Sequence, residues 1–174
     1  QVLFLLPEIA LTTQLVQRLT AYFGNEVAVF HSKYTNNERI EVWNQVLENS
    51  PKAKVVIGVR SALFLPFSNL GCIIVDEEHE QTFKQNDPAP RYHARDAAIV
   101  LAKQHGAKVV LGSATPSLET YYNVQTNKYG LTELKVRYGN VVLPEIQLVD
   151  LKYKYFRKKM SGHFSDELLE EITE

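Results

Sequence analysis

The sequence of 174 residues contains one cysteine, Cys72, and therefore no pair that could form an internal disulfide. A chain without a disulfide framework is typical of a reducing compartment, so we expect the protein in the cytoplasm. No apolar run approaches the roughly 20 residues that a membrane-spanning helix needs. The apolar start, residues 2–6, is too short for a signal peptide and has no basic lead. We therefore expect neither a signal peptide nor a membrane partner.

The sequence also has no excess of charge of either sign, because 19 basic and 20 acidic residues give a net charge of −1. The chain as a whole thus gives no sign of nucleic-acid binding, and any such binding has to come from local basic clusters. Hydrophobic residues make up 45% of the sequence, which is enough for one domain with a proper core.

Short apolar runs alternate with helical patterns along the first two thirds of the chain. The runs are rich in Val, Ile and Leu, as in parallel strands that are covered on both faces; they lie near residues 2–6, 27–30, 54–58, 71–75 and 107–111. Helical patterns follow them, one after a capping box of Thr35 and Glu38 and one after Thr115, an expected N-cap. This rhythm predicts an α/β fold with an open, mostly parallel sheet.

The pattern changes after about residue 128. Residues 131–136 and 146–149 are expected to form two more strands, and a last helix is expected to open at Ser165. Residues 151–163 are basic and aromatic, and we interpret them as a solvated linker, with a nucleic-acid contact as the alternative. The expected division is a domain over residues 1–150 and a linking segment over 151–174.

An acidic tetrapeptide, Asp76-Glu77-Glu78-His79, follows the apolar run that ends at Val75. An acidic pair at the end of a buried strand is how nucleotide-hydrolysing motors hold magnesium and position a water molecule. A polar loop that merely ends a strand is the alternative. The next strand is followed by Ser113 and Thr115, whose hydroxyls can bond phosphates, backbone groups or the neighbouring acidic loop.

Resemblance to a known family rests on five ordered segments, residues 6–12, 58–64, 75–79, 91–96 and 112–119. They resemble the primosomal protein N′ family, the bacterial replication-restart helicases of superfamily 2. The resemblance implies a RecA-like domain of the P-loop NTPase type and assigns roles by position. Asp76 would meet Mg²⁺ through water, Glu77 would activate the attacking water, and His79 would sense the nucleotide or simply bond a neighbouring loop. Glu78, Ser113 and Thr115 would couple ATP hydrolysis to movement on DNA.

The resemblance also implies DNA contacts, mainly with phosphates. They fall on two segments and comprise Pro7, Glu8, Thr12, Gln14, Arg60 and Ser61. Residues 80–96 add aromatic and basic side chains in a loop interrupted by prolines, where rings can stack on bases and cations can hold the backbone. We expect Phe83, Lys84 and Arg91 to contact DNA, and Tyr92 and Arg95 to serve packing and ion pairing. For Phe83, packing of the loop against the domain is the alternative.

A phosphate-binding loop of the form G-x-x-x-x-G-K-[ST] is absent from the sequence. Such a loop supplies the N–H groups and the lysine that hold the β- and γ-phosphates. We therefore expect a first RecA-like domain truncated at its N-terminus, without the phosphate-loop strand, and inactive by itself. Unpaired strand edges left by such a truncation are expected to favour self-association.

The parent protein implied by the resemblance is an ATP-dependent 3′→5′ DNA helicase that restarts stalled replication forks and directs primosome assembly. Its cofactors would be ATP and Mg²⁺, with zinc bound outside this segment. Its partners would be branched or single-stranded DNA, single-strand DNA-binding protein and primosome proteins, in the nucleoid of the bacterial cytoplasm.

Three alternatives remain open. A different superfamily 2 motor, such as a remodeller or restriction subunit, is disfavoured by the string at residues 91–96. A non-catalytic DNA-binding or scaffold module derived from such a motor would lack the phosphate loop upstream as well. A metal-dependent nuclease or hydrolase that uses residues 76–79 would need a second cluster of carboxylates or histidines, and the sequence shows none at ligand-like spacing.

Overall fold

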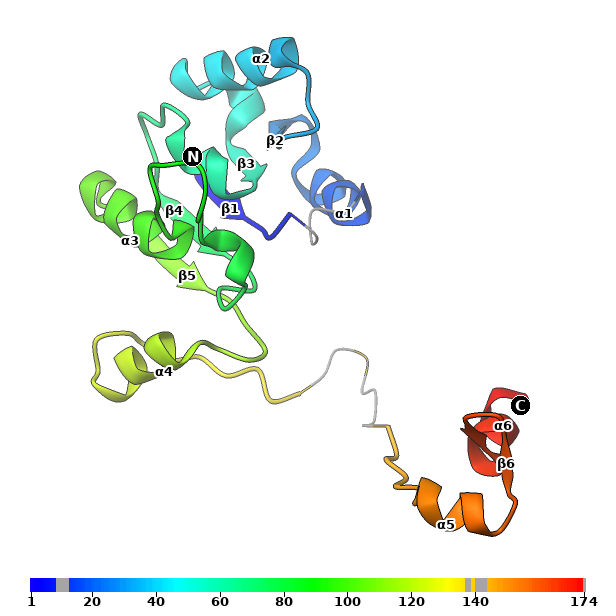
Figure 1. The fold of residues 1–174 in the computed structure, drawn as a ribbon. Helices are drawn as coiled ribbons and strands as arrows, with labels where there is room; N and C mark the ends of the chain where they lie inside the picture. The colour runs from blue at the N-terminus through cyan, green and yellow to red at the C-terminus, as the bar shows by residue number, and fades with distance from the viewer. Residues whose placement is uncertain (9–12, 137–138, 140–143, 174) are drawn as a thin grey trace. The chain divides into compact units, whose positions relative to one another are not determined.

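The computed structural model describes residues 1–8, 13–136, 139 and 144–173 (Figure 1). It divides into two compact units, Gln1–Leu131 and Thr132–Glu174. The boundary predicted from the sequence lies later, at residue 150, and as a functional boundary it stays a prediction. Among the described helices, none has the length and hydropathy that a bilayer crossing requires.

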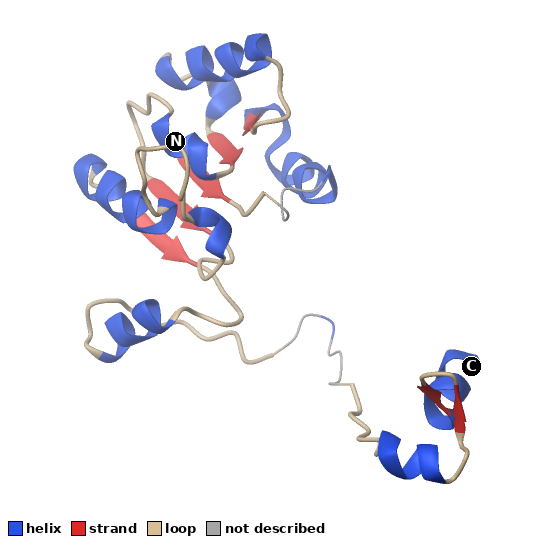
Figure 2. Cartoon of the chain, viewed as in Figure 1, coloured by secondary structure: helices blue, strands red, loops and turns tan. Residues whose placement is uncertain are grey.

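A parallel sheet forms the centre of the first unit (Figure 2). Its five strands lie in the order β2-β3-β1-β4-β5, and every neighbouring pair is parallel. The bounds are β1 Val2–Leu5, β2 Val27–Phe30, β3 Val55–Gly58, β4 Cys72–Val75 and β5 Lys108–Leu111. The five predicted strands and the open parallel sheet are thus confirmed. Because all strands are parallel, their carboxyl ends lie along the same side of the sheet, which we call its carboxyl edge.

Helices cover the two faces of this sheet unequally. The α-helices described in this unit are α1 Thr13–Phe23, α2 Asn36–Leu47, α3 Ala94–His105 and α4 Leu118–Gln125. Leu3 and Leu5 of β1 pack with residues of α2 and α3 in the larger core cluster. The intervening Phe4 packs in a smaller cluster with Leu15 and Leu19 of α1. Strand side chains alternate between faces, so α2 and α3 cover one face and α1 the other.

Short 3₁₀ turns connect several of these elements: η1 Gly24–Glu26, η2 Pro51–Ala53, η3 Arg60–Phe64 and η4 Gln81–Phe83. The turn η3 packs tightly on the end of β3. A Cβ atom at Gly58 would lie 2.4 Å from Ala62 Cβ and 2.9 Å from the Phe30 carbonyl oxygen. Only glycine leaves room for this approach, so Gly58 fixes the position of η3.

Capping explains two helix ends. The predicted capping box at the start of α2 is confirmed, because the Thr35 N–H donates to Glu38 Oε2 at 2.7 Å and the Glu38 N–H donates to Thr35 Oγ1. The start of α4 differs from the prediction. Ser117, rather than Thr115, is its N-cap and accepts a hydrogen bond from the Thr120 N–H. The Thr115 hydroxyl is instead directed at His79.

The prediction of two strands after residue 128, at residues 131–136 and 146–149, is wrong, because the described residues there form no strand. Both ranges have irregular backbone, and their apolar side chains Leu134 and Leu148 are exposed. Without a neighbouring strand or a core face, an apolar run gains nothing from an extended conformation.

The second unit contains α5 Leu151–Phe156, a hairpin of β6 Met160–Ser161 and β7 Phe164–Ser165, and α6 Asp166–Thr173. Asp150 caps α5, and Lys154 pairs with Asp166 and Glu167 across the unit. Residues 151–163 therefore contain α5 and the first strand of the hairpin, and their role as a solvated linker stays a prediction. The predicted start of the last helix is confirmed, because the Ser165 hydroxyl accepts from the Leu168 N–H.

Candidate functional site

The acidic loop after β4 and the hydroxyl loop after β5 lie at the same edge of the sheet. The Asp76 N–H donates to the Leu5 carbonyl at 3.0 Å, and the Gly112 N–H donates to the Val75 carbonyl at 2.8 Å. The Glu78 N–H then donates to the Gly112 carbonyl at 3.0 Å. These backbone bonds continue the sheet beyond its strands and fix the two loops against each other.

Asp76 and Glu77 are both half-buried at this edge. Asp76 Oδ1 accepts from the Glu77 N–H at 3.0 Å, and Glu77 has a left-handed φ of 49°. A Cβ atom at Gly112 would come within 3.3 Å of Asp76 Oδ1. The missing side chain at Gly112 therefore leaves the space that the Asp76 carboxylate occupies.

The donor set of this edge fits Mg²⁺. Magnesium in phosphoryl-transfer sites keeps several waters and is bound by one or two carboxylates together with substrate phosphates. Asp76 and Glu77 supply two carboxylates of that kind. Among the described residues no three His, Cys, Asp or Glu side chains converge as direct ligands. Contact of Asp76 with the metal through water stays a prediction.

His79 connects the two loops. Its Nδ1 lies 2.7 Å from Ser113 Oγ, and its Nε2 lies 3.4 Å from Thr115 Oγ1. Glu77 Oε2 is 3.6 Å from the same Nδ1. The structure thus brings together four predicted site residues, Glu77, His79, Ser113 and Thr115. It shows the loop-bonding alternative for His79, while a role in sensing nucleotide stays a prediction.

Glu78 points away from this edge into the protein and is only 1% exposed. Its carboxylate accepts from the Ser117 N–H at 2.7 Å, from the hydroxyls of Ser117 and Thr120, and from Arg95 Nη1 at 3.0 Å. Arg95 Nε also donates to Asp96 at 2.9 Å. The predicted ion-pairing role of Arg95 is therefore confirmed.

These contacts decide the ionisation of the buried pair. Burial raises the pKa of the Glu78 carboxyl, but the bonds from the Ser117 N–H, Arg95 and two hydroxyls outweigh burial, so this pKa lies below its usual value. Burial lowers the pKa of Arg95, and the bonds to Asp96 and Glu78 raise it above its usual value. Ser117 and Thr120 were not identified from the sequence, although their position directly after the hydroxyl loop was a signal.

Residues 80–93 form a loop that follows the acidic tetrapeptide and contains η4. Lys84 and His93 pair as an isolated antiparallel bridge, and the Gln85 N–H donates to the Tyr92 carbonyl at 2.8 Å. Arg60 holds the base of the loop, because its Nη1 donates to the Thr82 carbonyl at 3.0 Å. Tyr92 packs edge-on against Phe64, with ring centroids 5.1 Å apart, as expected for a packing role.

Two residues expected to contact DNA are buried in this structure. Phe83 is 1% exposed and belongs to the main core cluster, so its ring anchors the loop and is not open for stacking on a base. Pro7 is also buried, where it follows the end of β1. The packing alternative for Phe83 is the one that the structure shows.

The remaining predicted DNA contacts are accessible or lie outside the described residues. Glu8, Gln14, Lys84 and Arg91 are exposed and Ser61 is half-buried. Thr12 lies outside the described residues. The guanidinium of Arg60 is already engaged with loop carbonyls.

Comparison with known proteins gives the family. Residues 1–124 match the family of DEAD/DEAH box helicases. The chain is 44% identical over 174 residues to "Replication restart protein PriA" of Bacillus subtilis (strain 168), covering 100% of this chain and 21% of that protein. It is 51% identical over 151 residues to the protein of that name in Rickettsia prowazekii (strain Madrid E), covering 87% and 23%. The corresponding Haemophilus influenzae protein is 48% identical over 161 residues, covering 92% and 22%.

The chain therefore spans roughly a fifth to a quarter of the length of these curated relatives. Their names confirm the resemblance to replication-restart helicases. The five-stranded parallel sheet, flanked by helices, and the matched family confirm the predicted RecA-like α/β fold. On this basis the chain belongs to the DEAD/DEAH box helicase family.

Proposed function

We propose that this chain is part of the first motor domain of an ATP-dependent 3′→5′ DNA helicase that acts in replication restart and primosome assembly. The observation that carries the proposal is the convergence of Glu77, His79, Ser113 and Thr115 at the carboxyl edge of β4 and β5. A carboxylate that can position water lies within ion-pair distance of His79, and His79 is hydrogen-bonded to the neighbouring hydroxyl loop, which gives hydrolysis a physical route to movement.

Each residue has a distinct task in this proposal. Magnesium, when bound with ATP, neutralises the charge that develops on the phosphates. Asp76, beside Gly112, is the residue that would hold the hydrated metal. Glu77 accepts the proton of the attacking water or aims it, and His79 passes changes at Glu77 to Ser113 and Thr115. Glu78 fixes the loop through its buried bonds with Arg95 and Ser117.

We further propose that the chain does not hydrolyse ATP by itself. No phosphate-binding loop occurs in its sequence, so the carboxylates lack the cradle that would hold a triphosphate in line with the water. Several further proposals concern the longer protein and are in keeping with the names of its relatives. They are its helicase activity, its zinc, its binding of single-strand DNA-binding protein and primosome proteins, and its location in the bacterial nucleoid.

DNA contact by the loop at residues 80–93 can be tested through its exposed cations. We expect the double change Lys84→Ala and Arg91→Ala to weaken binding of a single-stranded oligonucleotide and to lower the salt slope of log affinity by about 0.7 for each phosphate that is no longer neutralised. Fluorescence anisotropy at several salt concentrations measures both. The matched control is Lys52→Ala with Lys103→Ala, which removes equal charge from the amino-terminal side of β3 and from the last turn of α3. An equal effect of the control pair would contradict the proposal.

Self-association through the sheet edge is a separate proposal. In the described sheet, β5 is an edge strand whose Val110 is 52% exposed, and Leu118 and Tyr122 of α4 are exposed as well. An unpaired edge with apolar side chains favours pairing with another chain.

We expect the sedimentation mass to rise with concentration and Val110→Lys to shift the protein toward monomer. Val100→Lys is the control, because Val100 is similarly exposed but lies on α3. A monomer mass that does not change with concentration would refute this proposal.

A further inference from the structure

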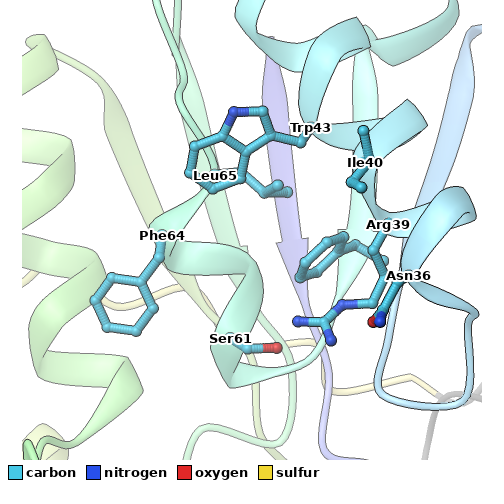
Figure 3. Close-up of a pocket in the computed structure, with 8 residues that line it drawn as sticks. Asn36, Arg39, Ile40, Trp43, Ser61, Phe64 and Leu65 are labelled. Atoms are coloured by element: carbon cyan, nitrogen blue, oxygen red, sulfur yellow. The ribbon is translucent and has the colours of Figure 1, made fainter.

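A hollow of about 490 Å³ lies between α2 and the turn η3 (Figure 3). Its volume falls within the range of roughly 300 to 1,000 Å³ that is usual for small-ligand sites. The lining residues come from β2, α2, η3 and the residue after η3: Phe30, Asn36, Arg39, Ile40, Trp43, Ser61, Phe64 and Leu65. Of these residues, only Ser61 was predicted from the sequence to take part in function.

The hollow has a polar end and an apolar end. Figure 3 shows the Arg39 guanidinium and the Ser61 hydroxyl at one end, and the Trp43 ring beside Leu65 at the other. Phe64 also lines the hollow, and Figure 3 shows its ring to one side of these residues. One end therefore offers a cation and hydrogen-bonding groups, and the other offers flat aromatic surface.

Two aromatic side chains that line this hollow remain partly exposed to solvent in the folded protein. Trp43 is 44% exposed and Phe64 is 57% exposed, although neighbouring residues of the same elements are buried. Arg39 lies over the Phe30 ring at 5.4 Å, and no carboxylate of the described residues is within ion-pair distance of it. An aromatic surface beside a cation without a carboxylate partner has charge complementarity to an anionic ligand that carries a ring.

The position of the hollow connects it with the proposed DNA-binding loop. Asn36 begins α2 after β2, and Ser61 follows β3, so these two lining residues lie toward the same carboxyl edge of the sheet as Asp76. Arg60, next to Ser61, holds the loop at Thr82. The ring of Phe64 contacts Tyr92 of that loop.

We propose that this hollow binds one base of a single DNA strand, stacked on Trp43, with the adjoining phosphate held by Arg39 and Ser61. The inference rests on the proposed function, because it assumes that a single strand reaches this edge. Stacking tolerates every base, since each has a π-face, and the cation beside the ring suits the phosphate that follows a base in a strand. An apolar peptide would use the Trp43 end but would leave Arg39 without an anion.

Intrinsic fluorescence tests this directly, because Trp43 is the only tryptophan of the chain. We expect an oligothymidylate to quench the emission of Trp43 on binding. An abasic oligonucleotide of the same length, which offers phosphates without bases, is expected to bind more weakly and to leave the emission nearly unchanged. Equal quenching by both oligonucleotides would overturn the proposal.

Substitutions separate the base from the phosphate. Trp43→Ala should weaken oligothymidylate binding roughly 5- to 150-fold without changing the salt slope, and Trp43→Phe should retain most of the affinity. Arg39→Gln should instead lower the salt slope by about 0.7. Thermal unfolding followed by circular dichroism checks that each variant folds as the parent does. Unchanged affinity of a folded Trp43→Ala variant would overturn the proposal.

The result also separates this inference from the proposed function. If the chain binds DNA through Lys84 and Arg91 while Trp43 emission stays unchanged, the base site is wrong and the helicase proposal stands. If the chain binds neither oligonucleotide at low salt, the base site and the proposed DNA contacts of Lys84 and Arg91 both fail, while the assignment of the hydrolysis site is tested separately by Glu77→Gln. Quenching by an apolar peptide but not by oligothymidylate would assign the hollow to a protein partner and refute a base site.

Discussion

Changing Glu77 to glutamine is expected to lower ATP hydrolysis by about 10²- to 10⁴-fold, the usual contribution of a positioned general base. The experiment uses a longer version of the protein in which a phosphate-binding loop precedes this segment. Glutamine keeps the size of the side chain and the left-handed turn at residue 77 but cannot accept a proton. ATP affinity should therefore stay nearly unchanged, and the loss should appear in kcat.

Steady-state hydrolysis and a separate nucleotide titration measure the two quantities. Glu119→Gln is the matched control, because it removes an exposed carboxylate in the first turn of α4, outside the contacts of the site. A Glu77→Gln protein that hydrolyses ATP at the parent rate would contradict the role of Glu77. An extended protein that binds no ATP at all would favour the non-catalytic DNA-binding module instead.

Removing Arg95 is expected to destabilise the first unit by about 3 to 5 kcal/mol, the usual result of leaving one member of a buried ion pair alone. The Glu78 side chain is 1% exposed, and its carboxylate would keep only Ser117 and Thr120 as donors after Arg95→Ala. Chemical denaturation measures the free energy of unfolding. Arg91→Ala removes an exposed arginine from the neighbouring loop and should change this free energy by less than about 0.5 kcal/mol.

The same pair gives the protein an acid limit. Because the pKa of Glu78 is lowered in the folded state, its contribution to stability is complete above the unfolded value of 4.5 and is lost as pH falls through the folded pKa. In Arg95→Ala the buried carboxyl lacks its cation, so its folded-state pKa should rise toward the unfolded value, and the stability lost on acidification should become smaller than in the parent. A parallel pH profile of stability in parent and variant would contradict this account.

Strand positions could be predicted from the sequence because the strands of the sheet are short runs made up mostly of apolar residues, such as Cys72–Val75. The capping box of α2 was predictable for a similar reason, since Thr35 and Glu38 are close in sequence. The carboxylates at the end of β4 and the hydroxyls after β5 could be placed at one edge because parallel strands end together. Local patterns were therefore sufficient for the sheet and the outline of the site.

Features that depend on distant partners could not be predicted in this way. The role of Phe83 is decided by the core against which η4 packs, and the sequence around it resembles an exposed loop. Thr115 was a good cap by sequence, but His79 lies close to its hydroxyl and Ser117 caps the helix. Residues 131–136 have the composition of a strand but no strand beside them in the described structure.

The hydrogen bonds from Arg60 to the loop at residues 80–93 determine which substitutions that loop can tolerate. Arg60 donates to the main-chain oxygens of residues 82 and 84 and not to their side chains. Any amino acid that keeps the local backbone path can therefore stand at those two places without loosening the attachment. Substitutions of the side chains at residues 82 and 84 are therefore expected to leave the attachment of this loop to Arg60 intact.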